Sequence, residues 1–318
     1  MKHLIKRAKR SLLLFAFSVL AYEGGIGQQH TINTLKINSS KELLDFFRYT
    51  GNDVPLVSGH RGGTTKGFPE NCIPTFENTL RYTPAFFEID PRLTKDSVIV
   101  LLHDATLDRT TNGKGKLADY TYEQLKQFRL KDPQGNVSEF KIPTLDEVIV
   151  WSKGKTIINL DKKDVPLEMT SAKLKQHKAE AHVMLTVHNA KEAKYYITNN
   201  PNVMFSAFVL TKAAFDEYEK EGIPWSHVMA YVGPTNKPEN KLLYDLLHAK
   251  GVMCMISAAP SYDKLPDPQA RKKAYADIIQ QGANVVESDL PIEAGEAVQA
   301  LTPKQSPKNK YFVTKKSS

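Results

Sequence analysis

The sequence predicts an α/β fold, a (β/α)8 TIM barrel with a small insertion after the second barrel strand. Three observations support this prediction: short apolar segments recur along the chain, helix-like segments separate most of them, and eight remain once a hairpin strand is set aside. Strands that alternate with helices form parallel sheets, and eight parallel strands are the number that closes this barrel.

The candidate strands are rich in aliphatic, β-branched and aromatic residues. They occupy residues 56–58, 85–90, 98–103, 156–161, 183–187, 203–208, 228–232, 252–256 and 284–287. Segment 98–103 follows segment 85–90 too closely for a parallel crossover, because only residues 91–97 separate the two. We therefore interpret residues 98–102 of this segment as a hairpin strand outside the barrel.

Helix-like segments lie in most of the remaining gaps. They occupy residues 73–82, 145–152, 190–198, 212–221, 241–250 and 267–281. A further short helix over 41–49 is predicted from Ser39 and Glu42, which suit a helix start. We expect this helix to belong to an N-terminal extension, residues 28–52, and to pack outside the main domain, residues 53–301, whose insertion covers residues 104–141.

The two ends of the chain have their own composition. Residues 1–27 resemble a secretory signal, with five basic residues ahead of an apolar run over 11–22 that is too short to span a bilayer. We expect cleavage before Gln28 and secretion into a bacterial periplasm, without a stable membrane span in the mature protein; an uncleaved anchor is the alternative. The basic tail, residues 302–318, is predicted to be disordered because it combines Lys, Pro and Ser.

The net charge of +8 comes from these ends rather than from the domain between them. The leader carries +4 and the tail +5, which leaves residues 28–301 at −1. Because no basic stripe with interleaved aromatic residues is present, we expect no nucleic-acid partner. Cys72 and Cys254 are the two cysteines, and we favour buried free thiols over a disulfide between them.

Chemically active side chains follow the ends of the early strands. His60 and Arg61 follow the first strand, Glu88 and Asp90 end the second, and His103 ends the hairpin strand. Residues i and i+2 of a strand point the same way, so the two carboxylates project together, and their oxygen ligands favour Mg²⁺ or Ca²⁺ over zinc. A lone histidine or acidic pair is more often structural. Acid, base, cation ligands and an arginine together suit phosphodiester cleavage, so we interpret the chain as an enzyme.

The segment from Gly59 to Gly115 resembles the glycerophosphodiester phosphodiesterase family. The matching residues follow the family's order and approximate spacing: His60-Arg61-Gly62, Pro69-Glu70-Asn71, Phe76, Glu88-Ile89-Asp90, Thr94-Lys95-Asp96, His103-Asp104, Leu107, Arg109-Thr110-Thr111 and Gly113-Lys114-Gly115. A thinner resemblance continues through residues 143–147, 159–163 and 282–291.

This resemblance implies a metal-dependent phosphoric diester hydrolase acting on small glycerophosphodiesters. It would release glycerol phosphate and an alcohol through a cyclic phosphate, and the insertion would form a cap over part of the site. The implied roles are ligation of Ca²⁺ or Mg²⁺ by Glu88, Asp90 and Asp161, acid–base catalysis by His60 and His103, and phosphate binding by Arg61 and Lys163.

The chain departs from the family pattern at two places. Asp161 stands where a glutamate is usual, and the shorter side chain favours Ca²⁺. The run 255–258, Met-Ile-Ser-Ala, stands where Trp-Thr-Val-Asn is frequent, so we do not expect choline or ethanolamine as the leaving alcohol. His188, Phe208 and Tyr231 are placed to line the rim, and a position in the core or behind the site is the equal alternative for each.

Two other functions remain open. One is phospholipase-like cleavage of inositol or sphingoid phosphodiesters, which an exposed apolar rim on the cap would favour. The other is non-catalytic binding of a sugar phosphate. The presence of both histidines with all three carboxylates argues against the binding protein, because binding requires no proton-transfer pair.

Overall fold

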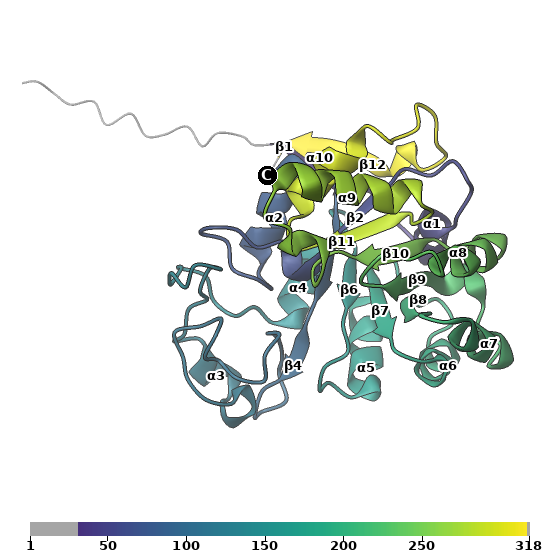
Figure 1. Ribbon diagram of the computed structural model, residues 1–318. Helices are drawn as coiled ribbons and strands as arrows, with labels where there is room; N and C mark the ends of the chain where they lie inside the picture. Colours follow the sequence, from purple (N-terminus) through teal and green to yellow (C-terminus); the bar gives the residue numbers. More distant parts are fainter. Residues whose placement is uncertain (1–30, 317–318) are drawn as a thin grey trace, which may run out of the picture.

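The computed structural model describes residues 31–316, which form a closed barrel of eight parallel strands (Figure 1). The strands are β2 (Leu56–Gly59), β3 (Phe86–Ile89), β6 (Ile158–Leu160), β7 (Val183–Val187), β8 (Met204–Phe208), β9 (Val228–Gly233), β10 (Cys254–Ser257) and β11 (Val285–Ser288). Strand β11 pairs with both β10 and β2, which closes the ring. The predicted (β/α)8 barrel is confirmed.

Eight helices surround this barrel. They are α2 (Ile73–Tyr82), α4 (Leu145–Ser152), α5 (Leu167–His177), α6 (Ala190–Asn199), α7 (Lys212–Lys220), α8 (Asn240–Ala249), α9 (Pro268–Gln280) and α10 (Pro291–Gln299). Helices α2 and α4 have the predicted bounds, whereas α5 and α10 were not predicted. Both bury mainly small or hydroxyl side chains, such as Thr170 and Ser171 in α5 and Ala294 in α10, so their apolar periodicity is weak.

The segment after β3 forms a hairpin and then the insertion. Strands β4 (Pro91–Leu93) and β5 (Ile99–Leu101) pair antiparallel outside the barrel, as predicted. The insertion contains η2 (Leu117–Asp119) and α3 (Tyr122–Leu125) and has its own apolar cluster, which includes Leu107 and Leu130. In Figure 1, α3 lies on the same side of the molecule as β4, and α6 and α7 lie on the opposite side.

Helix α1 (Ser40–Phe47) closes the amino-terminal end of the barrel. The Ser39 hydroxyl caps it by accepting a hydrogen bond from the Glu42 amide at 3.2 Å. Its side chains Leu43, Phe46 and Phe47 are fully buried. They pack against residues at or beside the first positions of the strands: Leu56, Phe86, Ile157, Met184, Met204, Met229, Met253 and Val285. The prediction that this helix packs outside the main domain is wrong, because its apolar face covers the barrel floor.

Residues 302–316 form a defined part of the fold. Strand β12 (Phe312–Lys316) pairs antiparallel with β1 (Thr31–Leu35), and η5 (Asn309–Tyr311) precedes it. The predicted disorder of residues 302–318 is therefore wrong for residues 302–316. The prediction from composition failed because long-range contacts hold this segment. Tyr311 packs against Phe46, with ring centroids 5.4 Å apart, and Lys308 is only 1% exposed.

The predicted signal peptide, residues 1–27, lies outside the described residues. Within residues 31–316, no helix combines the length and the apolar character that crossing a membrane requires. Cys72 and Cys254 are both buried and free, as predicted.

We expect Lys308→Met to destabilise the protein by about 3 kcal/mol, because breaking a buried ion pair leaves its partners unsatisfied. The Lys308 ammonium donates hydrogen bonds to the carbonyls of Phe46 at 2.5 Å and Arg48 at 2.7 Å, and it lies 3.3 Å from Asp53. Urea denaturation measures the change. Lys310→Met, at an exposed neighbouring position, is the control, and equal stability of the two variants would contradict a role for this buried charge.

Candidate active site

Most of the polar side chains singled out by the sequence gather at the carboxyl ends of the barrel strands, whereas His103 lies two residues after the hairpin strand β5. His60 begins η1 (His60–Gly62) directly after β2, and Asp90 and Asp161 directly follow β3 and β6. Glu88 and Glu287 lie near the ends of β3 and β11. Because the carboxyl ends of parallel strands meet at one rim of the barrel, residues distant in sequence are brought together there.

Three of these carboxylates form a cluster. Glu88, Asp90 and Asp161 each offer an oxygen, and these oxygens all lie within 4.8 Å of one another. Burial, together with the charges of Asp90, Asp161 and Glu287, raises the pKa of Glu88 well above its usual range. Burial also opposes ionisation of Asp161, but His188 and Lys163 lower its pKa to about 2.

The cluster has the properties expected of a cation site. Asp90 Oδ1 is buried without a hydrogen bond, although Lys163 Nζ lies 3.0 Å away in an unsuitable direction for one. Two buried carboxylates and the partly buried Asp161, with an Asp90 oxygen that accepts no hydrogen bond, suit a hard divalent cation, which binds oxygen ligands and relieves their mutual repulsion. The residues therefore fit such an ion, while their role as ligands remains a prediction.

Backbone and amide groups hold the cluster in place. Asn71 Nδ2 donates to Asp90 Oδ2 at 2.7 Å, and the Asp90 amide donates back to Asn71 Oδ1 at 3.0 Å. The Arg61 amide donates to Glu88 Oε2 at 3.1 Å. Both Asn71 and Arg61 adopt positive φ angles, 59° and 52°, a conformation that costs energy for residues other than glycine.

The loop that carries His60 and Arg61 requires the glycines that follow it. Gly63 has φ +81°, and a Cβ there would lie 2.1 Å from Cγ of Pro291 at the start of α10. A Cβ on Gly62 would lie 2.5 Å from the Phe76 ring of α2. The loop can therefore approach both helices only because these two positions have no side chain.

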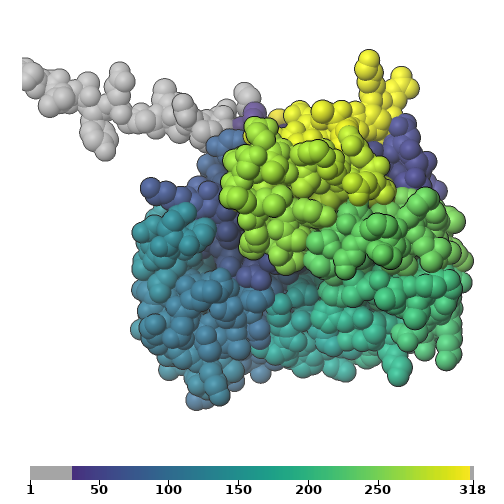
Figure 2. Space-filling model, viewed as in Figure 1, coloured from purple at the N-terminus to yellow at the C-terminus, as the bar shows by residue number. Residues whose placement is uncertain are grey.

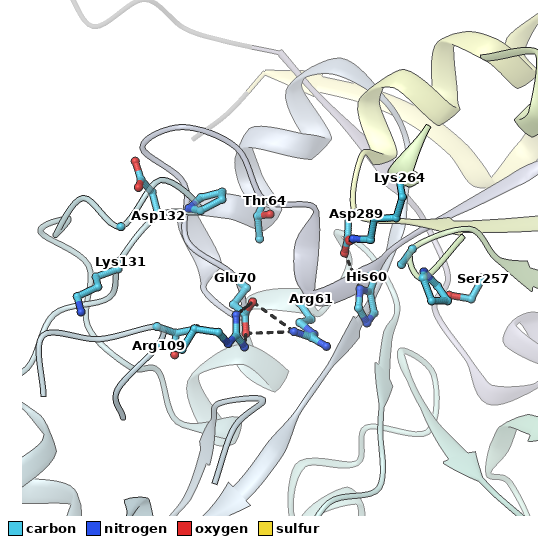
Figure 3. A pocket seen from close by; sticks show the side chains of 15 residues that line it. His60, Arg61, Thr64, Glu70, Arg109, Lys131, Asp132, Ser257, Lys264 and Asp289 are labelled. Atoms are coloured by element: carbon cyan, nitrogen blue, oxygen red, sulfur yellow. Dashed lines mark hydrogen bonds and ion pairs between the residues drawn. The ribbon is translucent and has the colours of Figure 1, made fainter. Parts of the chain in front are cut away.

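His60 is oriented by a carboxylate. Its Nδ1 lies 2.6 Å from Asp289 Oδ1 (Figure 3). This leaves Nε2 directed to the cluster, 4.0 Å from Glu88 Oε2. Burial lowers the pKa of His60, but the hydrogen bond to Asp289 and the charges of Glu287 and Asp289 outweigh burial and raise it overall. Asp263 in turn fixes Asp289, whose amide donates to Asp263 Oδ2 at 2.6 Å.

His103 has a similar carboxylate partner. Its Nδ1 lies 2.8 Å from Asp104 Oδ1, and Asp104 also accepts a hydrogen bond from Arg109 Nε at 2.8 Å. Hydrogen bonds from Arg109 hold the pKa of Asp104 well below its usual range. Arg109 donates to Glu70 as well, and Glu70 lies 3.4 Å from Arg61, so the insertion is connected to the barrel loop (Figure 3).

Two cavities adjoin His60. The smaller, of about 160 Å³, lies in the barrel mouth and is lined by His60, Glu88, Asn159, Asp161, Thr186, Ser206, Phe208, Tyr231, Met255, Ser257 and Glu287. The larger, of about 660 Å³, lies between the barrel rim and the insertion. Phe208 contacts both His188 and Tyr231, with ring centroids 4.6 Å apart in each pair, so these three residues lie near the rim as expected.

Some of the connections were absent from the sequence-based prediction. Asp104 and Asp289 had no predicted role, although each lies within two residues of a singled-out residue, His103 and Glu287. Lys163, predicted as a phosphate contact, forms ion pairs with Asp90 and Asp161. Lys162 points away to Glu192, as its alternate position in the chain predicts.

Comparison with known proteins identifies relatives of this site and fold. The model of the Glycerophosphoryl diester phosphodiesterase family matches residues 60–269. A crystal structure of a glycerophosphoryl diester phosphodiesterase from Parabacteroides distasonis is 57% identical, with a TM-score of 0.88, and the match covers 89% of this chain and 100% of that one.

Two further relatives are more distant. A glycerophosphodiester phosphodiesterase from Caldanaerobacter subterraneus is 42% identical over 95 residues, which represent 29% of this chain and only 38% of the relative's length. An Oleispira antarctica phosphodiesterase, solved with the product sn-glycerol-3-phosphate, is 21% identical with a TM-score of 0.61; the match covers 82% of this chain and 100% of that one. At that identity the likeness shows a shared fold.

Proposed function

Because the chain belongs to the glycerophosphoryl diester phosphodiesterase family, we propose that it hydrolyses glycerophosphodiesters to glycerol phosphate and an alcohol, with a divalent cation as cofactor. The observation that carries the proposal is the convergence of Glu88, Asp90 and Asp161 beside a histidine already oriented by Asp289. A bound product in the Oleispira antarctica relative is consistent with the same substrate class.

The two histidines are proposed to move the protons of the reaction. With Nδ1 of His60 and of His103 facing a carboxylate, each Nε2 is free to exchange a proton with the substrate. One histidine removes the proton of the glycerol 2-hydroxyl, and the other protonates the departing alcohol as its P–O bond breaks. The product of this step is a cyclic phosphate.

The second step reverses these roles. A water molecule attacks the cyclic phosphate, giving up one proton to the histidine that now acts as base, and the ring oxygen that leaves phosphorus takes a proton from the other. The net reaction adds one water across the bond between phosphorus and the alcohol. When bound, a divalent cation would lower the pKa of a hydroxyl group and neutralise charge on the phosphoryl oxygens.

Arg61 and Lys163 are proposed to contact the phosphoryl group. Arg61 Nε is buried without a hydrogen-bond acceptor among the described residues, so it can donate to a phosphoryl oxygen. Lys163 Nζ lies among the carboxylates, close to where the phosphoryl charge would be held. Preorganised cations of this kind stabilise the charge that develops in the transition state.

The phospholipase alternative has little support on the cap. Among the described residues 104–141, Val137 is the one large hydrophobic side chain that is exposed. A cap that engages lipid would be expected to present a larger apolar rim.

The test of the proposed function is release of glycerol phosphate from a panel of deacylated phospholipids, with and without a chelator. We expect hydrolysis that the chelator abolishes and that added Mg²⁺ or Ca²⁺ restores. Binding of the diesters without turnover would instead support a non-catalytic sugar-phosphate binding protein.

We favour Ca²⁺ over Mg²⁺, because the shorter Asp161 side chain suits the longer metal–oxygen distance of about 2.3 to 2.6 Å. We expect Asp161→Glu to shift the preference towards Mg²⁺, whose ligands lie at about 2.0 to 2.1 Å. Metal titration by calorimetry of both proteins measures the ranking of the two ions. If the native protein prefers Mg²⁺ and the glutamate variant keeps that ranking, the argument from side-chain length is wrong.

We also propose that the protein is exported to the periplasm, supported by the leader-like composition of residues 1–27. Expression of the full chain followed by N-terminal sequencing of the extracellular or periplasmic fraction tests this. Retention of residues 1–27 on the mature protein would favour the uncleaved anchor.

A further inference from the structure

The larger cavity is built from four separate parts of the chain. The insertion contributes Arg109, Thr110, Lys131, Asp132, Pro133 and Gly135; loops after β2 and β10 and the residue after β11 supply the remainder. Figure 2 shows the insertion and the light-green segment around β10 and α9 facing one another across a hollow. His60 and Ser257 line both cavities, so a substrate cleaved beside His60 can extend into each.

The acidic residues of this larger cavity already have partners. Glu70 accepts hydrogen bonds from Arg109 at 2.8 and 2.9 Å, and Asp289 is held by His60. Asp132 accepts from the amides of Gly67, Gln134 and Asn136 at 2.9 to 3.0 Å. These carboxylates are therefore poorly available to a positively charged ligand.

Two basic residues of the cavity, Lys131 and Lys264, are less fully paired. Lys131 forms no ion pair with any residue between 31 and 316, and its Nζ makes one long hydrogen bond, 3.4 Å, to the carbonyl of Asp108. Lys264 is 67% exposed and lies 3.5 Å from Asp289. Figure 3 shows these two lysines at opposite ends of the cavity lining, with Arg61 and His60 between them.

The cavity also lacks the features that recognise a quaternary ammonium group. No Phe, Tyr or Trp within residues 31–316 lines it, whereas Phe208 and Tyr231 both line the smaller cavity. Aromatic faces are the usual partners of such cations. The smaller cavity suits the glycerol unit, and the larger one has room for a bulky polar leaving group.

We propose, resting on the proposed function, that the larger cavity binds the leaving alcohol and that Lys131 and Lys264 select an alcohol carrying a second phosphate anion. Arg61 contacts the scissile phosphate between the two lysines. A leaving alcohol that extends towards the cap brings its additional charge to Lys131, and one that extends along the barrel rim brings it to Lys264. The preferred substrates are then glycerophosphodiesters whose alcohol is itself a phosphate ester.

The experiment compares three diesters that differ in the charge of the leaving alcohol: bis(glycerophospho)glycerol, glycerophosphoglycerol and glycerophosphocholine. The readouts are kcat/KM and, by calorimetry, Kd for the metal-loaded enzyme. We expect the first diester to be preferred over the second by about tenfold at low salt, as one partly screened charge contact would give. Glycerophosphocholine should be the poorest of the three.

The variants are Lys131→Gln, Lys264→Gln and the double substitution, with Lys116→Gln, an exposed lysine of the insertion outside the cavity, as the matched control. The ratio between bis(glycerophospho)glycerol and glycerophosphoglycerol should fall towards one in the double variant and stay unchanged in the control. Using this ratio removes any effect of Lys264 on Asp289 that is common to all substrates.

Failure of the inference and failure of the proposed function give different results. Hydrolysis of all three diesters without a preference for bis(glycerophospho)glycerol, or with a preference that the double variant retains, overturns the inference alone. If none of the three diesters is hydrolysed, the proposed function is wrong. The Kd values of bis(glycerophospho)glycerol and glycerophosphoglycerol are then compared. Tighter binding of the first that the double variant loses supports the inference, and equal binding of the two overturns it.

Discussion

Glu88→Gln and Asp90→Asn are each expected to abolish cation binding and to reduce hydrolysis to the limit of detection. Both substitutions preserve side-chain size while removing a negative oxygen ligand from a group of three that lie within 4.8 Å of one another. A hard cation held by three carboxylates loses much of its electrostatic stabilisation with any one of them. Calorimetric titration with Ca²⁺ and Mg²⁺ and the rate of glycerol phosphate release measure the two effects.

Although Glu88→Gln should lose cation binding and activity, its metal-free form should be at least as stable as the native protein. Burial and neighbouring charges raise the pKa of Glu88, so its ionised form is less favourable in the folded than in the unfolded protein. Removing that charge should leave the midpoint of thermal unfolding of the metal-free protein unchanged or higher, while eliminating the rise in midpoint that an added cation produces.

Glu192→Gln provides the control for loss of a buried negative charge near the same rim. Glu192 is 9% exposed and pairs with Lys162, outside the carboxylate cluster. This variant should retain cation binding and activity. Full turnover of Glu88→Gln, or of the native protein in excess chelator, would contradict the metal role.

The barrel was predictable because its strands are continuous apolar segments separated by helices at regular intervals. The hairpin β4–β5 was equally predictable, since a connection limited to residues 91–97 cannot accommodate a crossover. Helices α5 and α10 were not, because hydroxyl and small residues carry much of their buried faces. Their position is determined by packing against the strands rather than by local pattern.

The terminal segments show the limits of composition more sharply. Lys308 has the same charge as the exposed Lys310, and the sequence does not distinguish them. Its burial depends on the free carbonyls at the end of α1, more than 250 residues away. Long-range contacts of this kind cannot be inferred from the tail alone.

The sequence predicts those site residues that end a strand or directly follow one. The convergence of Glu88, Asp90 and Asp161 follows from strand ends meeting at one rim. The pairing of His60 with Asp289 depends on closure of the barrel between β11 and β2, and that of Asp104 with Arg109 on the path of the insertion. Both require the three-dimensional arrangement.

The acid–base pair gives the second large expected effect. His60→Ala and His103→Ala should each lower the rate by about two to four orders of magnitude, the usual contribution of a positioned proton-transfer group. Binding of glycerol phosphate should persist, because neither change removes Arg61 or the carboxylates. Steady-state kinetics and product binding by calorimetry measure the two quantities. His227→Ala is the matched control. The His227 ring contacts the carbonyl of Val203, directly before β8 and therefore at the amino-terminal end of the strands, away from the site.

Varying the pKa of the leaving alcohol shows which histidine is the acid of the first step and which is the base. An alcohol of low pKa, such as p-nitrophenol, departs without being protonated, so a glycerophosphodiester of p-nitrophenol bypasses the general acid in that step alone. Release of p-nitrophenol should recover in the variant that lacks the acid and should stay slow in the variant that lacks the base. His60 and His103 each have a carboxylate on Nδ1, although His60 lines both cavities and His103 lines neither. The difference in the rate of p-nitrophenol release assigns their roles. A variant that keeps the native rate on a diester with a poor leaving group would show that its histidine is structural.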